Sequence, residues 1–224
     1  MQEARLYEKL ADQLVRCQLC AHRCRIQPGQ RGTCGVRENR GGVLYSLVYG
    51  LLISQAVDPV EKKPLFHFHP GSGAFSIATV GCNFRCTFCQ NADISQLPHD
   101  GRRILGRETA AAAIVDAAHR CRCQSIAYTY TEPTVFFEYV YDVSVLARQA
   151  GLANVFVTNG YMTPEMLKAY HPYLDAANVD LKAFRDDFYQ RTCRARLQPV
   201  LDSLKLMKEQ GIWLEVTTLV IPGH

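Results

Sequence analysis

From residue 75 onward, short β-branched runs alternate with amphipathic helical patterns, and this alternation limits the possible folds most. The runs predict strands at residues 75–80, 125–130, 154–159, 177–182 and 212–220. The intervening segments predict helices at residues 108–120, 133–151, 163–170 and 197–211. Strands that alternate with helices form βαβ units with a parallel sheet. The sequence therefore predicts an α/β fold, either an open doubly wound sheet or a partial (β/α) barrel with about five parallel strands.

Cap residues support two of the predicted helices. Pro133 stands in the first turn of one helix, and Gly151 follows its last turn. Thr163 is the expected N-cap of the next helix, with Pro164 at its first helical position. These positions fix where the helices begin and end.

Polar clusters follow the predicted strands directly. GCNFRCTFCQN follows the first strand, TEP the second and TNGY the third, while Asp180 and Lys182 end the fourth. In both possible folds, ligands bind at the carboxyl ends of parallel strands. We therefore expect these four clusters to meet at one rim.

Three cysteines, Cys82, Cys86 and Cys89, follow the first predicted strand with the spacing C-x3-C-x2-C. Soft thiolate ligands on one tight loop suit an iron–sulfur cluster, and three protein ligands leave one iron of a [4Fe-4S] cluster open. The alternatives are buried thiols or a zinc site whose fourth ligand is a histidine, namely His67, His69 or His99.

The first 74 residues precede the alternation of strand and helix patterns. We expect them to form a separate N-terminal part, 1–74, before the barrel at 75–224. Apolar residues between positions 3 and 16 recur near helical spacing and predict a helix. A Cys-rich segment follows, and residues 43–57 predict a strand pair bent near Gly50.

The N-terminal cysteine group forms a second possible metal site, and its members are Cys17, Cys20, Cys24 and Cys34. Four thiols within so short a polar segment suit a zinc ion that stabilises a segment too small to fold alone. An auxiliary iron–sulfur cluster and unliganded thiols are the alternatives. The remaining cysteines, Cys121, Cys123 and Cys193, are expected to be incidental thiols.

Composition excludes several classes of protein. The 224 residues are 48% apolar, so a sizeable core can form, and the net charge of +4 is spread without a basic block, which argues against a nucleic-acid partner. The sequence contains no apolar stretch of membrane-spanning length. Clustered cysteines at this frequency are typical of metal or redox centres in a reducing compartment. We therefore expect a soluble, cytoplasmic protein.

The cysteine loop, with Phe88 before its last cysteine, resembles the CxxxCxΦC signature of the radical S-adenosylmethionine (SAM) superfamily. Gln90 and Asn91, together with TEP, TNGY, DLK and the terminal LVIPG, are similar to the branch that contains pyruvate formate-lyase activating enzymes. Within that branch, DPVEKKPLFHFHPGS and CQLCAHRCRIQPGQRGTCGVREN resemble the radical enzymes of the AmmeMemoRadiSam system.

The resemblance implies a particular chemistry. The open iron of the [4Fe-4S] cluster chelates SAM, and one electron from a donor such as ferredoxin or flavodoxin cleaves it to methionine and a 5′-deoxyadenosyl radical that abstracts hydrogen from a substrate. Memo-like and AMMECR-like proteins are implied as partners by the same resemblance.

The resemblance also implies which residues bind SAM. The set is Phe88, Thr131, Glu132, Thr158, Asn159, Asp180 and Lys182. Glu132 is expected to accept hydrogen bonds from the methionine ammonium, and Lys182 to pair with the carboxylate. The alternatives are a first-turn acid for Glu132, a simple turn at Asn159 and a salt bridge at the rim between Asp180 and Lys182.

Three functions remain open from the sequence. The favoured one is a radical SAM enzyme with an unknown substrate, and the second is an activating enzyme that takes hydrogen from a glycine of a partner protein. The third is a non-catalytic iron–sulfur electron-transfer module. The related families continue beyond the fifth strand, so the chain is either truncated or naturally short, and we expect it to associate through strand 212–220.

Overall fold

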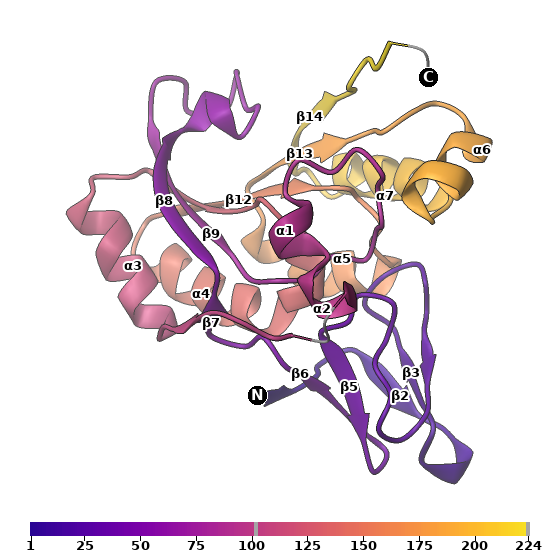
Figure 1. Ribbon diagram of the computed structural model, residues 1–224. Helices are drawn as coiled ribbons and strands as arrows, with labels where there is room; N and C mark the ends of the chain where they lie inside the picture. Colours follow the sequence, from indigo (N-terminus) through magenta and orange to yellow (C-terminus); the bar gives the residue numbers. More distant parts are fainter. Residues whose placement is uncertain (101–102, 223–224) are drawn as a thin grey trace.

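The structure is a computed structural model that describes residues 1–100 and 103–222. Its centre is a six-stranded sheet with the order β14-β13-β12-β11-β9-β8 (Figure 1). The strands are β8 Ser54–Pro59, β9 Gly73–Ala78, β11 Ser125–Tyr128, β12 Ala153–Thr158, β13 Ala176–Asp180 and β14 Trp213–Thr217. The order follows the chain without reversal, which is the order of a partial barrel and not of a doubly wound sheet.

The five parallel strands confirm the predicted fold class and its approximate strand count. Parallel pairs join β9 to β11, β11 to β12, β12 to β13 and β13 to β14, whereas β8 pairs antiparallel with β9. All four residues of β11 are buried, as expected for a strand covered on both faces.

The predicted helices are present, and they pack beside one another against the sheet (Figure 1). They are α3 Ala111–Arg120, α4 Phe137–Gln149, α5 Pro164–Tyr170 and α7 Gln198–Glu209. The Thr163 hydroxyl caps α5 by accepting the Met166 N–H at 3.1 Å, with Pro164 in the first turn, which confirms the predicted start. The Pro133 turn is a separate 3₁₀ helix, η3 Pro133–Phe136, that leads into α4.

Shorter helical turns lie in the connections. They are α1 Ala92–Ser95, α2 Leu97–Asp100, α6 Asp186–Phe188, the π-helical turn η5 Tyr189–Cys193, and the 3₁₀ turns η1 Ala11–Gln13, η2 Val60–Lys62 and η4 His171–Tyr173.

The N-terminal part is built from small sheets that project below the barrel in Figure 1. Its strands are β1 Gln2–Glu3, β2 Tyr7–Lys9, β3 Val15–Cys17, β4 Arg25–Ile26, β5 Arg37–Arg40, β6 Val43–Ser46 and β7 Leu51–Leu52. Strand β7 pairs with β10 Arg107–Glu108, β3 pairs with β2 and β4, and β6 pairs with β1 and β5.

The helix predicted between residues 3 and 16 is wrong. This segment forms β1, β2, η1 and the start of β3. Val15, Cys17 and Leu19 are buried and alternate with more exposed residues, so the period of two that begins at Val15 outweighs the approximate helical spacing before it.

The two strands predicted within residues 43–57 exist, but they do not pair with each other. Gly50 lies between them with a φ of +72°. β6 joins the small N-terminal sheet, whereas β8 becomes the antiparallel edge of the barrel sheet. Residues from both expected parts therefore share one sheet, and the division at residue 74 stays a prediction.

Strand β14 forms the other edge of the sheet among the described residues. Its Trp213 and Val216 side chains are about half exposed, and Val220 beyond it is largely exposed. The LVIPG motif that follows extends past residue 222 and so lies partly outside the described residues. Association through this edge stays a prediction. Within the described part of the chain, no helix is long and apolar enough to cross a membrane.

Candidate functional site

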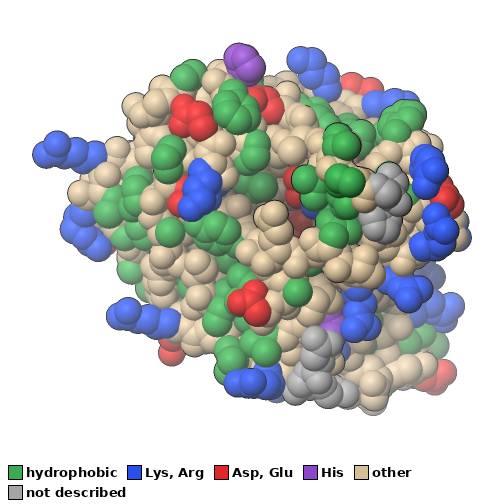
Figure 2. Space-filling model, turned by 45° about the horizontal axis from the view of Figure 1, so that its top comes forward, with side chains coloured by type: hydrophobic (Ala, Val, Ile, Leu, Met, Phe, Trp, Pro, Cys, Tyr) green, Lys and Arg blue, Asp and Glu red, His purple; other side chains and the backbone are tan. Residues whose placement is uncertain are grey.

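A cavity of about 270 Å³ lies at the carboxyl ends of the parallel strands. Figure 2 shows a hollow near the middle of one face of the molecule, with charged side chains inside it and hydrophobic side chains on its rim. Predicted site residues that line the cavity are Cys82, Cys86, Phe88, Cys89, Thr131, Asn159, Asp180 and Lys182. The structure thus brings the expected clusters of four strands together at one rim.

The cysteine loop after β9 directs its sulfurs toward hydrogen-bond donors. Cys82 Sγ accepts the backbone N–H of Phe84 at 3.3 Å and the side-chain amide of Asn159 at 3.8 Å. Cys89 Sγ lies 3.4 Å from the hydroxyl oxygen of Ser95. Such donors stabilise negative charge on sulfur, so the loop is suited to hold thiolates.

Cys193, expected to be an incidental thiol, is buried beside Cys86. Its thiol donates to Cys86, and this hydrogen bond lowers the pKa of Cys86 while it raises the pKa of Cys193. The backbone N–H of Arg85 also donates to the Cys193 carbonyl at 3.0 Å. The turn η5 therefore supports the cysteine loop, a contact that sequence spacing did not indicate.

Glu132 is fully buried behind the cavity, and its carboxylate joins two strand ends. Oε1 accepts from the Thr134 N–H at 3.0 Å, the Thr134 hydroxyl at 2.5 Å and the Thr158 hydroxyl at 2.8 Å. Oε2 accepts the Asn159 N–H at 2.9 Å. Burial raises the pKa of Glu132, and these hydrogen bonds oppose the rise. Glu132 thus holds Asn159 in place and also caps η3, so it begins a helix as the alternative expected, but it is buried and not a surface acid.

Asp180 and Lys182 form a close pair at the end of β13. Lys182 Nζ lies 2.6 Å from Asp180 Oδ2. Burial opposes the charge of Lys182, but Asp180 outweighs it, so the pKa of Lys182 is raised. The lysine is therefore a cation that lines the cavity, as both the ligand and the salt-bridge interpretations require.

The wall of the cavity also contains Tyr130, which no sequence pattern indicated. Its φ is +63°, and its hydroxyl donates to Asp58. Lys63 is 1% exposed, and its Nζ donates to the same Asp58 oxygen, Oδ2, at 2.6 Å. The Lys63 Nζ also lies 4.4 Å from the centre of the Tyr130 ring. The DPVEKK motif therefore supports the cavity wall. This role depends on the pairing of β8 with β9, so it could not be inferred from the sequence of the motif.

Three histidines were considered as zinc ligands for the cysteine loop. The His99 ring nitrogen Nε2 lies 3.5 Å from the Cys82 carbonyl oxygen, so His99 is next to the loop. His67 lies 3.5 Å from Glu215, and His69 packs against Phe68. Only the His99 contact among these connects a histidine with the cysteine loop.

The four N-terminal cysteines border a second, very small cavity. Its volume is about 10 Å³, and Arg37 and Val135 also line it. Burial raises the pKa of Cys34 to about 12 and that of Cys20 well above its usual value. Within residues 1–100 and 103–222, no group of three or more His, Cys, Asp or Glu side chains is arranged to hold a metal ion as it stands.

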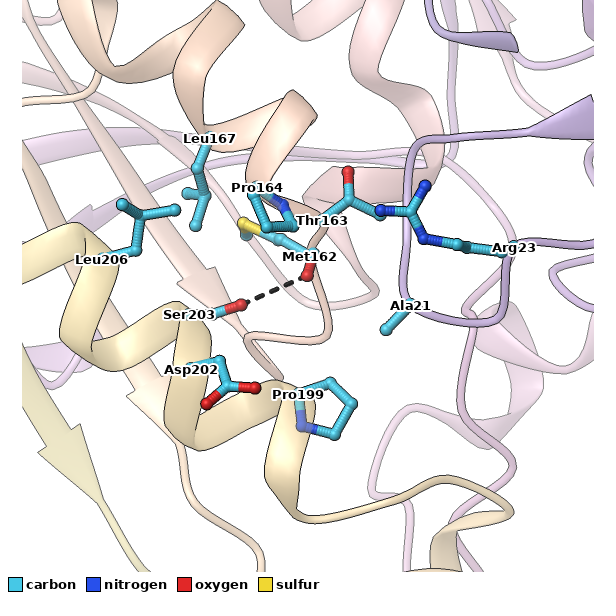
Figure 3. Close-up of a pocket in the computed structure, with 10 residues that line it drawn as sticks. All are labelled: Ala21, Arg23, Met162, Thr163, Pro164, Leu167, Pro199, Asp202, Ser203 and Leu206. Carbon is cyan, nitrogen blue, oxygen red and sulfur yellow. Dashed lines mark hydrogen bonds between the residues drawn. The ribbon is translucent and has the colours of Figure 1, made fainter. Parts of the chain in front are cut away.

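A third cavity, of about 260 Å³, lies between α5, α7 and the loop that carries Ala21 and Arg23 (Figure 3). The Ser203 hydroxyl donates to the Met162 carbonyl oxygen at 3.3 Å across its floor. This cavity is on the helical side of the barrel and not at the strand ends, so it is separate from the predicted site.

The fold and the rim define a class of protein, namely a partial (β/α) barrel with a three-cysteine loop after its first parallel strand. A model of the radical SAM superfamily matches residues 76–224. This match covers more than half of the chain, and the chain therefore belongs to the radical SAM superfamily, whose members are enzymes that use SAM in radical chemistry.

The chain is similar in sequence to proteins of Methanocaldococcus jannaschii. It is 52% identical over 224 residues to an uncharacterized protein of Methanocaldococcus jannaschii, a match that covers 100% of this chain and 66% of that protein. A putative glycyl-radical enzyme activating enzyme of the same organism is 24% identical over 156 residues, which cover 68% of this chain and 58% of that protein. The chain thus spans less than two thirds of the length of these relatives.

Solved structures show the same fold. SuiB from Streptococcus suis bound to S-adenosylmethionine has a TM-score of 0.51 and 12% sequence identity, over 65% of this chain and 33% of that one. At this identity, the likeness concerns the fold alone.

Proposed function

We propose that this chain cleaves SAM reductively at a [4Fe-4S] cluster held by Cys82, Cys86 and Cys89, and that the resulting radical abstracts hydrogen from a substrate. One observation carries the proposal: all three cysteines line a single cavity with Asn159, Asp180 and Lys182. The donor set fits the cluster, because each cysteine sulfur has a hydrogen-bonding neighbour and three thiolates leave one iron free for SAM.

The rim residues then bind and orient SAM. Lys182 supplies a cation for the methionine carboxylate, and Asp180 supplies an anion for the ammonium. Asn159 is fixed by Glu132 and by Asn83, whose Oδ1 accepts its amide at 2.7 Å. The side chain of Asn159 therefore keeps one orientation between the cysteine loop and the bound SAM.

Cys82, Cys86 and Cys89 would hold the cluster, which, once reduced by a donor such as ferredoxin or flavodoxin, would supply the electron that breaks the carbon–sulfur bond of SAM. The protein contributes the walls of the cavity, which would orient SAM beside the cluster. Phe88 packs against Phe188 with ring centres 5.9 Å apart, and Thr131 donates to the Thr79 carbonyl at 2.9 Å. These contacts fix the walls of the cavity before SAM binds.

A glycyl-radical activating enzyme is the second candidate. A groove of about 330 Å³ shares Lys182 and Leu219 with the cavity and continues along Phe184. A groove that opens into the cavity suits a polypeptide substrate, and one relative is named as a putative activating enzyme. In contrast, an electron-transfer module needs no paired cation and anion beside its cluster. Memo-like and AMMECR-like partners remain part of the proposal through the sequence resemblance alone.

Anaerobic reconstitution with iron and sulfide tests the proposal. We expect an electron paramagnetic resonance signal that shifts when SAM is added, and 5′-deoxyadenosine when a strong reductant is present. Cys86→Ala should abolish both, whereas Cys121→Ala, which changes an exposed thiol, should leave both intact. A cluster that persists in a variant without Cys82, Cys86 and Cys89 would overturn the assignment.

The two candidate reactions are separated by a second assay. A pyruvate formate-lyase-type protein is added to the reduced enzyme with SAM, and the sample is examined for a glycyl-radical signal. Such a signal supports the activating function, whereas 5′-deoxyadenosine without it favours a different substrate. Co-purification with Memo-like or AMMECR-like proteins tests those partners.

A further inference from the structure

We propose that Cys17, Cys20, Cys24 and Cys34 bind one zinc ion, and that this ion fixes the loop that supports the SAM site. The proposal concerns a site other than the SAM cavity. It rests on the small cavity that the four cysteines share, on the donors around their sulfurs, and on a buried arginine that faces them.

The sulfurs of all four cysteines have a backbone N–H donor. The Thr33 N–H lies 3.4 Å from Cys24 Sγ, and the Thr33 hydroxyl oxygen lies 3.2 Å from it. The other three cysteines each accept a backbone N–H from two residues later in the chain, and the donors are Leu19, His22 and Val36. Neutral thiols do not need such donors, whereas metal-bound thiolates are stabilised by them.

Arg37 supplies the second, independent observation. It is 2% exposed and lines the small cavity, and its Nη atoms donate to Glu138 at 2.8 and 2.9 Å. Its Nε has no hydrogen-bond partner among the described residues. A buried guanidinium N–H without an acceptor is costly, and negative charge on the neighbouring Cys17 and Cys34 sulfurs would offset part of that cost.

The size of the cavity favours zinc over an iron–sulfur cluster. About 10 Å³ is the space of a single water-sized probe. A single tetrahedral ion needs less room than a cube of iron and sulfide atoms, so a cavity this small favours zinc once the four sulfurs turn toward it. Gly32 borders the same space, because a Cβ there would lie 3.6 Å from Cys24 Sγ and 3.1 Å from Ile26. Its missing side chain therefore leaves the room that the ion requires.

The ligand loop contacts the SAM site directly. His22 Nε2 lies 2.7 Å from the Asn83 carbonyl oxygen, next to Cys82. Gly81 has a φ of +102°, and a Cβ there would lie 3.2 Å from the Cys34 carbonyl oxygen. Because the two cysteine groups pack this closely, an ion that fixes one loop also limits the movement of the other.

The same loop contacts the segment that follows Asn159. The Ala21 N–H donates to the Tyr161 carbonyl at 3.2 Å, and the Thr163 hydroxyl donates to the Gln18 carbonyl at 2.6 Å. Figure 3 shows the outer side of this contact, where Ala21 and Arg23 face α5 and α7. Residues between the zinc ligands therefore pack against the barrel on one side, while the sulfurs face the ion on the other.

Metal analysis of a background variant tests the site without reliance on the proposed function. The background carries Cys82→Ala, Cys86→Ala and Cys89→Ala, so iron from the first site is removed. We expect about one zinc per chain by elemental analysis, a loss of that zinc in Cys24→Ala, and its retention in Cys121→Ala. Chains without zinc, or with iron and sulfide in its place, would overturn the proposal.

A second measurement covers the case in which Cys24→Ala does not fold. The unmodified chain is alkylated with and without a strong zinc chelator, and the modified cysteines are identified by mass spectrometry. We expect the half-buried Cys24 to react only after chelation, whereas the exposed Cys121 reacts in both samples. Equal reaction of Cys24 in the two samples would refute the site.

Discussion

Replacing Glu132 with Gln tests whether this residue positions Asn159 or touches SAM. The carboxylate is fully buried, and its two oxygens accept from Thr134, Thr158 and Asn159. In Glu132→Gln the amide oxygen can keep the three bonds of Oε1. The amide nitrogen then faces the Asn159 N–H, so two donors meet and one charge-assisted bond is lost.

The magnitude follows from that single lost bond. A hydrogen bond to a charged group contributes about 1.5–3 kcal/mol, and an orphaned buried donor costs about 1–3 kcal/mol. These costs overlap, and removal of a buried charge offsets part of them. We therefore expect the free energy of unfolding to fall by about 2–3 kcal/mol. For a chain of this size, the melting temperature should fall by about 4–12 °C.

Urea denaturation and SAM titration, both under anaerobic conditions, measure the two consequences. Iron content should not change, because no cysteine is removed. SAM affinity should fall, because Asn159 loses its fixed position. Thr158→Val is the matched control, since it removes a bond to the same carboxylate without altering a residue that lines the cavity.

The control decides between the two roles. If Glu132 acts by position, Thr158→Val also weakens SAM binding, in proportion to its smaller loss of stability. The opposite result is that Glu132→Gln weakens SAM binding while the free energy of unfolding stays unchanged, and that Thr158→Val has no effect on SAM binding. In that case the carboxylate contacts SAM, and the positioning role of Glu132 is refuted.

Three further predictions concern charged pairs. Glu138→Gln leaves the Arg37 charge buried without its partner and should lower the free energy of unfolding in urea by about 3–5 kcal/mol. Glu165→Gln, in the exposed pair with Arg23, should lower it by less than about 1 kcal/mol. Similar losses in the two variants would contradict the difference expected between buried and exposed pairs. Burial favours the neutral form of Asp58, but hydrogen bonds from Lys62 and Lys63 hold its pKa below the usual 3.8. The free energy of unfolding should therefore fall as the pH drops below 3.8. The fall should be smaller in Asp58→Asn, which cannot titrate. Lys182→Met should raise the SAM dissociation constant at least about tenfold, for a lost charged bond of about 1.5 kcal/mol; calorimetry with unchanged affinity would remove Lys182 from the site.

The barrel could be predicted from the sequence because its signals are local. Strand and helix periods, the Thr163 cap and the polar residues after each strand all act within a few positions along the chain. The N-terminal part could not be predicted in the same way. Its strands are two to four residues long and depend on pairing with one another, as β3 does with β2 and β4, so helical spacing before Val15 gave the wrong element.

The candidate site likewise combines residues that a local sequence motif indicates with residues that only the fold brings together. The cysteine loop carries its own signature, so its candidate ligands could be proposed from spacing alone. Cys193, Asp58 and Tyr130 come from distant segments, and only the fold brings them to the rim. The hydrogen bond from the Asn159 backbone to Glu132 uses an atom that every residue except proline has, so no sequence pattern could indicate it.

The two cysteine groups share one supporting framework. Thr134 and Val135 line the small N-terminal cavity, and Thr134 also donates to Glu132, which fixes Asn159 at the SAM cavity. On the other side, His22 contacts Asn83, which accepts from the same Asn159. Asn159 is therefore held from two directions by groups that border the N-terminal cysteines. We therefore expect a change at those cysteines to disturb η3 or the cysteine loop, and with them the position of Asn159.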